Sequence, residues 1–291
     1  MSKHRYLKHG ILVCVIFLGV ILTSACSNRS NTSAGITVLT EILLPDTLLE
    51  TSGLFCDNHN IYTLNDSGNL SEIYALNHTG KLSAQISVEA KNVDWEALAS
   101  DGKNFYIGDF GNNAGNRKDL RILIHNVDKK QTSQHTFTYA NDGDVANINE
   151  PQSRQYKAHD QDAEALVLKG DDLIMFSKSW KTGIASVYRI ETTSTNQILT
   201  PTASIAGLPG IITGADWDEH KQQFIIVGYK VNTFSVRPFI SLLDAQYNVT
   251  RTEYLKGFGQ VEGVCSTNGE LWFTQEKLPF YPAKLVNIAL K

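Results

Sequence analysis

The chain has 291 residues, of which 42% are hydrophobic and 19% are charged, and this composition is typical of an ordinary globular protein. Its formal net charge at pH 7 is −4, and no basic run interleaves with aromatic residues. Both features argue against nucleic acid as a partner, because proteins that bind it neutralise phosphates with clustered lysine and arginine.

The N-terminal segment predicts a targeting signal rather than a part of the fold. Lys3, Arg5 and Lys8 precede an apolar stretch over residues 11–22, which is short for a transmembrane helix. The residues Leu-Thr-Ser-Ala-Cys that end at Cys26 resemble a bacterial lipobox, whose cysteine receives a diacylglyceryl group. The alternatives are an ordinary secretory signal and a transmembrane anchor.

We therefore expect a signal peptide over residues 1–25, a lipidated Cys26, and a flexible tether that extends to residue 35. Two or three acyl chains on that cysteine would anchor the protein stably to a membrane. Ser27 stands where bacterial sorting rules place an inner-membrane retention aspartate, which favours the outer membrane. The expected location is the bacterial cell envelope.

After the tether, residues 36–44 predict a β-strand with no partner before it in the sequence. Five units of similar pattern follow. Each has a polar, a small and an apolar residue, then a turn signal such as Asp101-Gly102, then an apolar or aromatic run. The leading polar residues are Ser52, Glu96, Glu164, Thr213 and Glu262.

Successive units lie 44, 68, 49 and 49 residues apart. A repeat of roughly 40–50 residues with several short strands is typical of a β-propeller blade. The expected strands of the first four units are 53–56, 61–64, 72–76 and 83–88; 97–99, 105–109, 121–126 and 135–139; 165–168, 173–177, 186–190 and 198–205; and 214–217, 224–228, 239–243 and 252–255. The last unit has only three, at 262–265, 271–275 and 284–290.

We therefore predict an all-β, five-bladed β-propeller as a single domain over residues 36–291. The N-terminal strand is expected to complete the last blade and close the ring, which hides an open sheet edge. Residues 141–160 form a polar insertion that accounts for the longest spacing and is too short for a blade. The alternatives are a six-bladed propeller and a β-sandwich.

Two cysteines, Cys56 and Cys265, are expected on the innermost strands of the first and last blades. An oxidising compartment would permit a disulfide between them. Their positions within the two units differ by one residue, which is expected to place the side chains on opposite strand faces. We therefore expect two buried free thiols, with a bridge as the alternative.

The repeat brings charged residues to one mouth of the central channel. The first strand of a blade lines the channel and the second returns antiparallel, so first-strand starts and second-strand ends meet there. Glu96, Glu164 and Glu262 are expected to converge near the axis. The residues expected to bind a ligand around them are Asp66, Asp109, Lys178 and Glu276.

Converging carboxylates repel one another, and their pKa values rise unless a cation compensates. Oxygen-rich rings suit Ca²⁺, which takes about six to eight oxygen ligands. The sequence therefore predicts a calcium site formed by Glu96, Glu164 and Glu262. The alternatives are structural capping of the first strands by these polar residues, and a ligand site without metal.

Signals for catalysis are sparser. The sequence has no Gly-x-Ser-x-Gly nucleophile elbow. His159 and Glu164 are the candidate general bases, with an exposed loop histidine as the alternative for His159. Trp95 is expected near the mouth together with Trp180 and Trp217, either as an aromatic wall for a ligand or as packing between blades.

Several of these motifs resemble a known group. Asp-Trp-Glu-Ala-Leu-Ala (94–99), Gly-Asp-Phe-Gly-Asn-Asn (108–113), Asp-Ala-Glu-Ala-Leu (162–166) and Val-Glu-Gly-Val (261–264) are similar to those of secreted β-propellers of the SdiA-regulated and esterase-like-phytase group. The resemblance covers residues 36–291. It implies a ring fold, an extracytoplasmic location and, in some members, calcium. Phytase-type members also use basic residues for phosphate, and this mouth offers only Lys178, Lys230 and Arg117.

Two functions follow as expectations. The first is a lipid-anchored extracytoplasmic propeller that binds a ligand or protein partner at the carboxylate-lined mouth, with calcium. The alternative is a metal-dependent hydrolase of a phosphoester or lactone at the same mouth, where the ion would lower the pKa of a bound water. An interaction domain that binds through the side of a blade is the third possibility.

Overall fold

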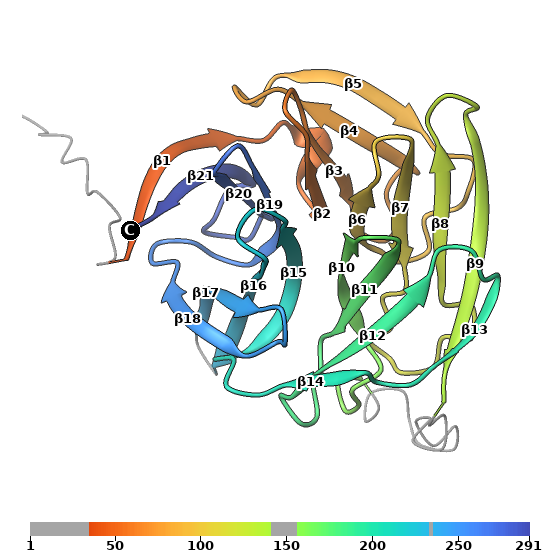
Figure 1. The fold of residues 1–291 in the computed structure, drawn as a ribbon. Coiled ribbons are helices and arrows are strands. Elements are labelled where there is room, and N and C mark those ends of the chain that lie inside the picture. The colour runs from red at the N-terminus through yellow and green to blue at the C-terminus, as the bar shows by residue number, and fades with distance from the viewer. Residues whose placement is uncertain (1–34, 141–155, 233–234) are drawn as a thin grey trace, which may run out of the picture. The chain divides into compact units, whose positions relative to one another are not determined.

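The structure, a computed structural model, describes residues 35–140, 156–232 and 235–291, which belong to one compact unit, Asn31–Lys291. The predicted signal peptide, Cys26 and most of the insertion lie outside the described residues. Five sheets follow one another around an axis (Figure 1), so the predicted five-bladed propeller is confirmed and the six-bladed alternative is wrong. No helix in the described ranges is long and apolar enough to cross a membrane.

Each blade is an antiparallel meander whose first strand contacts the first strands of both neighbouring blades. Blade 1 comprises β2 (Thr51–Cys56), β3 (Ile61–Asn65), β4 (Glu72–Leu76) and β5 (Leu82–Ser87), and blade 2 comprises β6 (Trp95–Ser100), β7 (Asn104–Asp109), β8 (Arg121–Asn126) and β9 (Gln131–Tyr139). Blade 3 comprises β10 (Ala163–Lys169), β11 (Asp172–Ser177), β12 (Ala185–Glu191) and β14 (Ala203–Ile205). Blade 4 comprises β15 (Ile211–Asp218), β16 (Gln223–Asn232), β17 (Ser235–Asp244) and β18 (Val249–Tyr254).

Blade 5 is built from both ends of the described chain. Its strands are β19 (Val261–Thr267), β20 (Glu270–Gln275), β21 (Lys284–Leu290) and the N-terminal β1 (Ile36–Leu43). β1 pairs antiparallel with β21, from Ile36 opposite Leu290 to Leu43 opposite Lys284. A short 3₁₀ helix, η1 (Asp46–Leu48), then leads into blade 1. The predicted closure of the ring by the N-terminal strand is therefore confirmed.

An irregularity in the pairing marks the same place in every first strand. The register shifts between Thr51 and Leu54, Trp95 and Ala97, Ala163 and Ala165, Ile212 and Gly214, and Val261 and Val264. Each of these intervals contains the leading polar residue of its unit. A bulge bends a strand and re-aims the side chain at that point. The repeated polar residue is therefore the bulged residue of each blade.

The small residue that follows each leading residue has a packing role. The positions are Gly53, Ala97, Ala165, Gly214 and Gly263, and they line a cavity of only about 10 Å³ on the axis. A Cβ at Gly214 would lie 2.2 Å from the Glu262 carbonyl oxygen, and one at Gly53 would lie 2.4 Å from the Leu98 amide nitrogen. Small side chains thus let five first strands approach closely, and the channel below the mouth is almost filled.

The hydrophobic core lies between blades. Each of five clusters of buried side chains draws its members from two neighbouring blades. Alternate residues of a first strand therefore face opposite neighbours: Cys56 packs toward blade 5, whereas Phe55 packs against Phe105 of blade 2.

The expectation of two free thiols is wrong, because Cys56 and Cys265 form a disulfide with a Cα–Cα distance of 5.6 Å. The offset of one residue is what two blades packed face to face require. Equivalent positions point in the same sense around the ring, so side chains that meet across a seam must lie on opposite faces of their strands. The disulfide joins the first strands of the first and last blades, at the seam that β1 also closes.

One predicted strand is divided in two. The sequence predicts a single strand over residues 198–205, but β13 (Asn196–Leu199) pairs parallel with β9 and extends blade 2, while β14 completes blade 3. Pro201 lies between the two strands and has no N–H for a ladder hydrogen bond, so the chain crosses between the blades there (Figure 1).

Candidate functional site

Three glutamates and one lysine form the centre of the mouth. Glu96, Glu164 and Glu262 occupy the bulged positions of β6, β10 and β19, and Lys178 follows the last residue of β11. Their residues are 5%, 4%, 6% and 5% exposed, respectively. The Lys178 Nζ lies 2.5 Å from the Glu164 Oε1. One cation is thus buried among three carboxyl groups from three blades.

Burial dominates the ionisation of this ring. It raises the pKa values of Glu96 and Glu164 well above the ordinary range, and neighbouring carboxylates add to the effect while Lys178 opposes it. Burial also raises the pKa of Glu262 to about 8 and that of Glu276 to about 7. Without a further cation, part of the ring therefore holds protons near neutral pH.

The stability of the metal-free protein should fall as pH rises. The folded protein binds protons on Glu262 and Glu276 more tightly than the unfolded chain does. The stability that this binding contributes is fully present below pH 4.5 and is lost as the pH rises from there to about 8. We expect the free energy of unfolding to drop by at least about 1.4 kcal/mol between pH 5 and pH 8.5, the value of one pKa unit on one group. Urea unfolding in EDTA measures this change, and a rise over that interval would contradict it.

A second group of carboxylates lies beside the ring. One oxygen each from Asp66, Asp94 and Glu96 fall within 4.8 Å of one another. Burial raises the pKa of Asp94 to about 6, and the charge of Asp66 adds to that shift. Three hard, anionic oxygens at this spacing match the ligand preference of Ca²⁺. Among the described residues, this is the arrangement that best fits a metal ion.

The surrounding loops hold the backbone next to these three carboxylates and pack closely against them. The Asn92 Nδ2 donates to the Asp66 carbonyl oxygen at 2.9 Å, and its Oδ1 accepts from the Trp95 amide at 3.2 Å. A Cβ at Gly111 would lie 2.3 Å from the Glu96 Oε1 and 2.5 Å from the Asp94 Oδ2. The loop after β7 can therefore cover the group only because a glycine stands there.

Two predicted ligand-binding side chains are engaged in the core, although the Asp109 Oδ1 also accepts from the Asp94 amide at 3.1 Å. Asp109 is fully buried between two arginines, with its oxygens 3.0 Å from the Arg117 Nη2 and 2.8 Å from the Arg121 Nη2. Trp95 is fully buried in the cluster between blades 1 and 2, as the packing alternative proposed. Neither side chain is available to a ligand in this arrangement, whereas Lys178 and Glu276 lie at the mouth with Asp66.

His159 is buried rather than exposed on a loop, at 6% exposure. Its Nδ1 accepts from the Gln161 amide at 3.0 Å, and its Nε2 donates to the Asn113 carbonyl oxygen at 3.3 Å. Both ring nitrogens are therefore occupied by backbone groups. The histidine ties the start of blade 3 to the loop of blade 2, which leaves no free nitrogen for a general base in this conformation.

The two other tryptophans predicted near the mouth, Trp180 and Trp217, lie in different places. The Trp180 Nε1 donates to the Asp162 Oδ2 at 2.7 Å, and its ring lies 5.1 Å from the Lys178 Nζ, so this tryptophan borders the mouth. Trp217 lies near the opposite end of its blade, where its Nε1 donates to the Glu219 carboxylate. Of the three tryptophans, only Trp180 therefore borders the mouth.

Sequence reasoning missed Asn92, Gly111 and Arg121. Gly111 stands in a run rich in glycine and asparagine, which signals a tight loop but not its contact with carboxylates. Asn92 and Arg121 belong to no recognisable motif. The partner of Asn92 is the backbone oxygen of Asp66, and the partner of Arg121 is Asp109, which lies opposite it on the neighbouring strand. Such roles depend on the folded geometry.

A scan against protein-family models and a search of curated proteins found no match. Among solved structures, the PQQ-bound aldose sugar dehydrogenase of Streptomyces coelicolor is 11% identical with a TM-score of 0.51, over 88% of this chain and 98% of that chain. A chain of a nidogen/laminin complex is 17% identical with a TM-score of 0.45, over 82% and 85%. A chain of hydrazine synthase of Kuenenia stuttgartiensis is 12% identical with a TM-score of 0.44, over 84% of this chain and 63% of that chain. The similarity to the dehydrogenase supports the propeller fold, which enzymes and binding proteins share.

Proposed function

We propose that the protein is a lipid-anchored, extracytoplasmic propeller that binds a ligand or partner at the carboxylate-lined mouth with the help of Ca²⁺. The observation that carries the proposal is the trio Asp66, Asp94 and Glu96, whose oxygens lie within 4.8 Å of one another. A bound calcium ion would offset two of the three negative charges that these carboxylates carry when ionised. It would also leave Lys178 and Glu164 as a paired, preorganised centre beside it.

The electrostatics favour a cation at this point. Asp94 and Glu96 both have raised pKa values because of burial and neighbouring carboxylates, so a divalent ion would relieve repulsion that the folded chain otherwise bears. An anionic or oxygen-rich group of a ligand would then bind beside the ion at the mouth. The proposed calcium ligands therefore differ from the three glutamates expected from the sequence. Glu96 remains a ligand, whereas Glu164 and Glu262 lie beside Lys178 and Glu276.

Calcium should stabilise the fold in a way that depends on Glu96. At a calcium concentration about 100 times its dissociation constant, binding adds about 2.7 kcal/mol, which raises the melting temperature by roughly 5–10 °C. We expect Glu96→Gln to abolish this shift. Glu41→Gln is the matched control, because Glu41 pairs with Lys284 on the outer strands of blade 5 and should leave the shift intact. Equal shifts in both variants, or none in the wild type, would contradict the proposal.

A hydrolase at the same mouth is the second candidate. Glu262 and Glu276 have pKa values of about 8 and about 7, and a carboxyl group that is partly protonated near neutral pH is suited to general acid catalysis. Turnover of a phosphoester or a lactone by the calcium-loaded protein, lost in Glu164→Gln, would favour the enzyme over the binding protein.

The proposed location has support from the disulfide, because such bonds persist in oxidising compartments such as the periplasm and cell surface. We expect the full chain expressed in a Gram-negative host to fractionate with membranes and its Cys26→Ser variant to become soluble. Labelling with a palmitate analogue should mark the wild type alone. Membrane association and labelling that both survive the substitution would contradict the lipid anchor.

A further inference from the structure

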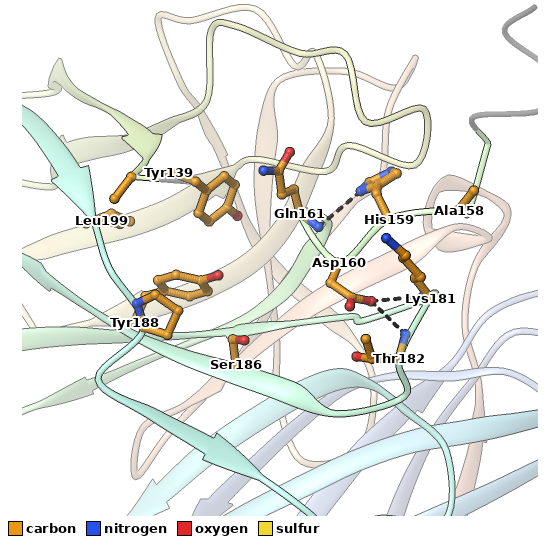
Figure 2. A pocket seen from close by; sticks show the side chains of 12 residues that line it. Tyr139, Ala158, His159, Asp160, Gln161, Lys181, Thr182, Ser186, Tyr188 and Leu199 are labelled. Carbon is orange, nitrogen blue, oxygen red and sulfur yellow. Dashed lines mark hydrogen bonds between the residues drawn. The ribbon is translucent and has the colours of Figure 1, made fainter. Parts of the chain in front are cut away.

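A second cavity, of about 220 Å³, lies between the outer strands of blades 2 and 3 (Figure 2). It opens on the same face as the carboxylate mouth, because its walls come from the end of β9, the start of β12 and the segment that enters β10. It is separate from the carboxylate group, since Asp66, Asp94 and Glu96 do not line it. Its size is below that of sites for drug-sized ligands, which occupy about 300–1,000 Å³.

Two tyrosines form one wall of this cavity. Tyr139 and Tyr188 are 6% and 5% exposed, and their ring centroids lie 5.1 Å apart. Figure 2 shows both hydroxyl groups pointing toward the side of the cavity on which Asp160 lies. The rings are thus held by the core between blades 2 and 3, while their hydroxyl groups are directed toward the cavity.

The Tyr139 hydroxyl is the unusual feature of this wall. It is buried and has no hydrogen-bond partner among the described residues. Burial of a hydroxyl without a partner costs free energy, and a water or a ligand that bonds to the group would remove this cost. Burial also raises the pKa of Tyr139 well above its ordinary value, so the group remains a neutral donor.

The opposite wall is polar, and its charges balance. The Asp160 Oδ1 accepts from the amides of Lys181 and Thr182, at 2.9 and 3.1 Å, which fixes the carboxylate at the cavity. Ser186 contributes a further hydroxyl, and the buried His159 has both ring nitrogens engaged. Asp160 and Lys181 are the oppositely charged pair that lines the cavity, so the described lining has no net charge to attract an ion.

We propose that this cavity is a binding site for a compact, neutral, polyhydroxylated ring, that is, a single sugar unit. Several hydroxyls and one fixed carboxylate converge on a space of that scale, and Leu199 and Pro201 supply apolar surface for the carbon–hydrogen faces of the ring. A ligand oxygen within reach of Tyr139 would satisfy its buried hydroxyl. This site is independent of calcium and of the proposed function of the mouth.

The test uses the calcium-free mature protein and four probes: glucose, galactose, mannose and N-acetylglucosamine. Saturation-transfer difference NMR, with titration to 20 mM, should show binding of at least one sugar and at least tenfold weaker binding of cyclohexanol, which has the ring but a single hydroxyl. Tyr139→Phe should weaken the sugar about fivefold or more, the effect expected of one lost hydrogen bond. Its melting temperature should stay unchanged or rise, because the variant removes a buried hydroxyl without a partner.

The matched control is Tyr106→Phe. The Tyr106 hydroxyl donates to the Asp101 Oδ2 at 2.9 Å, at the far end of blade 2. This variant should therefore lose thermal stability and keep its sugar affinity, the reverse of Tyr139→Phe. The proposal would be overturned if none of the four sugars bound. It would also be overturned if the sugar that binds the wild type bound the Tyr139→Phe variant with the same affinity.

Discussion

Lys178→Met is expected to lower the free energy of unfolding by about 3–5 kcal/mol at pH 7.5, which is the usual cost of breaking a buried ion pair by removing one partner. Lys178 is 5% exposed, and its amine lies 2.5 Å from the Glu164 carboxylate. Burial acts to lower the lysine pKa, but Glu164 and other anions outweigh it and raise the pKa well above its ordinary value. The lysine is therefore charged in the folded protein.

The pH dependence of this loss identifies its cause. The variant leaves Glu164 and its neighbours uncompensated, and protonation of these carboxyls relieves their repulsion. The loss should therefore shrink at pH 5, whereas a packing defect would cost the same at both values. Urea unfolding at the two pH values measures it, and Lys181→Met, an exposed lysine on the same segment, should change stability by less than about 0.5 kcal/mol. A loss that does not depend on pH would contradict the electrostatic account of the ring.

Removal of the disulfide should have an effect of similar size. Cys56 and Cys265 are separated by 209 residues, and the loop-entropy relation gives roughly 5 kcal/mol for a cross-link of that length as an upper value. We expect the double variant Cys56→Ala/Cys265→Ala to lose about 3–5 kcal/mol. The bond holds together the two innermost strands at the seam between the ends of the chain, so its loss leaves β1 to close the ring alone.

Equilibrium unfolding in urea, with and without a reducing agent, tests this expectation. The reductant should destabilise the wild type to about the level of the double variant and should leave the variant unchanged. A difference of less than about 1 kcal/mol between oxidised wild type and variant would contradict the role assigned to the bond.

The fold was predictable because a propeller repeats its chemistry. The polar residue at each bulge and the small residue after it are dictated by crowding at the axis, so the five leading residues and Gly53 or Gly214 carry the pattern in the sequence. The disulfide was only the alternative expectation, because the offset of one residue was taken to separate the two side chains. Across a seam between blades that pack face to face, this offset instead brings them together. The strand exchange at Pro201 depends on contacts between blades, which a local pattern does not encode.

The location of the candidate site could be predicted from the sequence, but the contacts within it could not. Position in the repeat places Glu96, Glu164 and Glu262 at one mouth, but it does not specify which carboxylates approach each other. In the structure Glu96 joins Asp66 and Asp94, while Glu164 pairs with Lys178. Side-chain length and loop packing decide this partition, and neither has a sequence period.

The most direct test of the calcium site is a crystal structure of the mature protein grown with 10 mM CaCl₂, with anomalous diffraction recorded at long wavelength. The account predicts one anomalous peak bonded to oxygens of Asp66, Asp94 and Glu96 at about 2.3–2.6 Å, the range of calcium–oxygen distances. Ordered carboxylates with no peak, or a peak held instead by Glu164 and Glu262, would contradict the assignment of calcium to this trio.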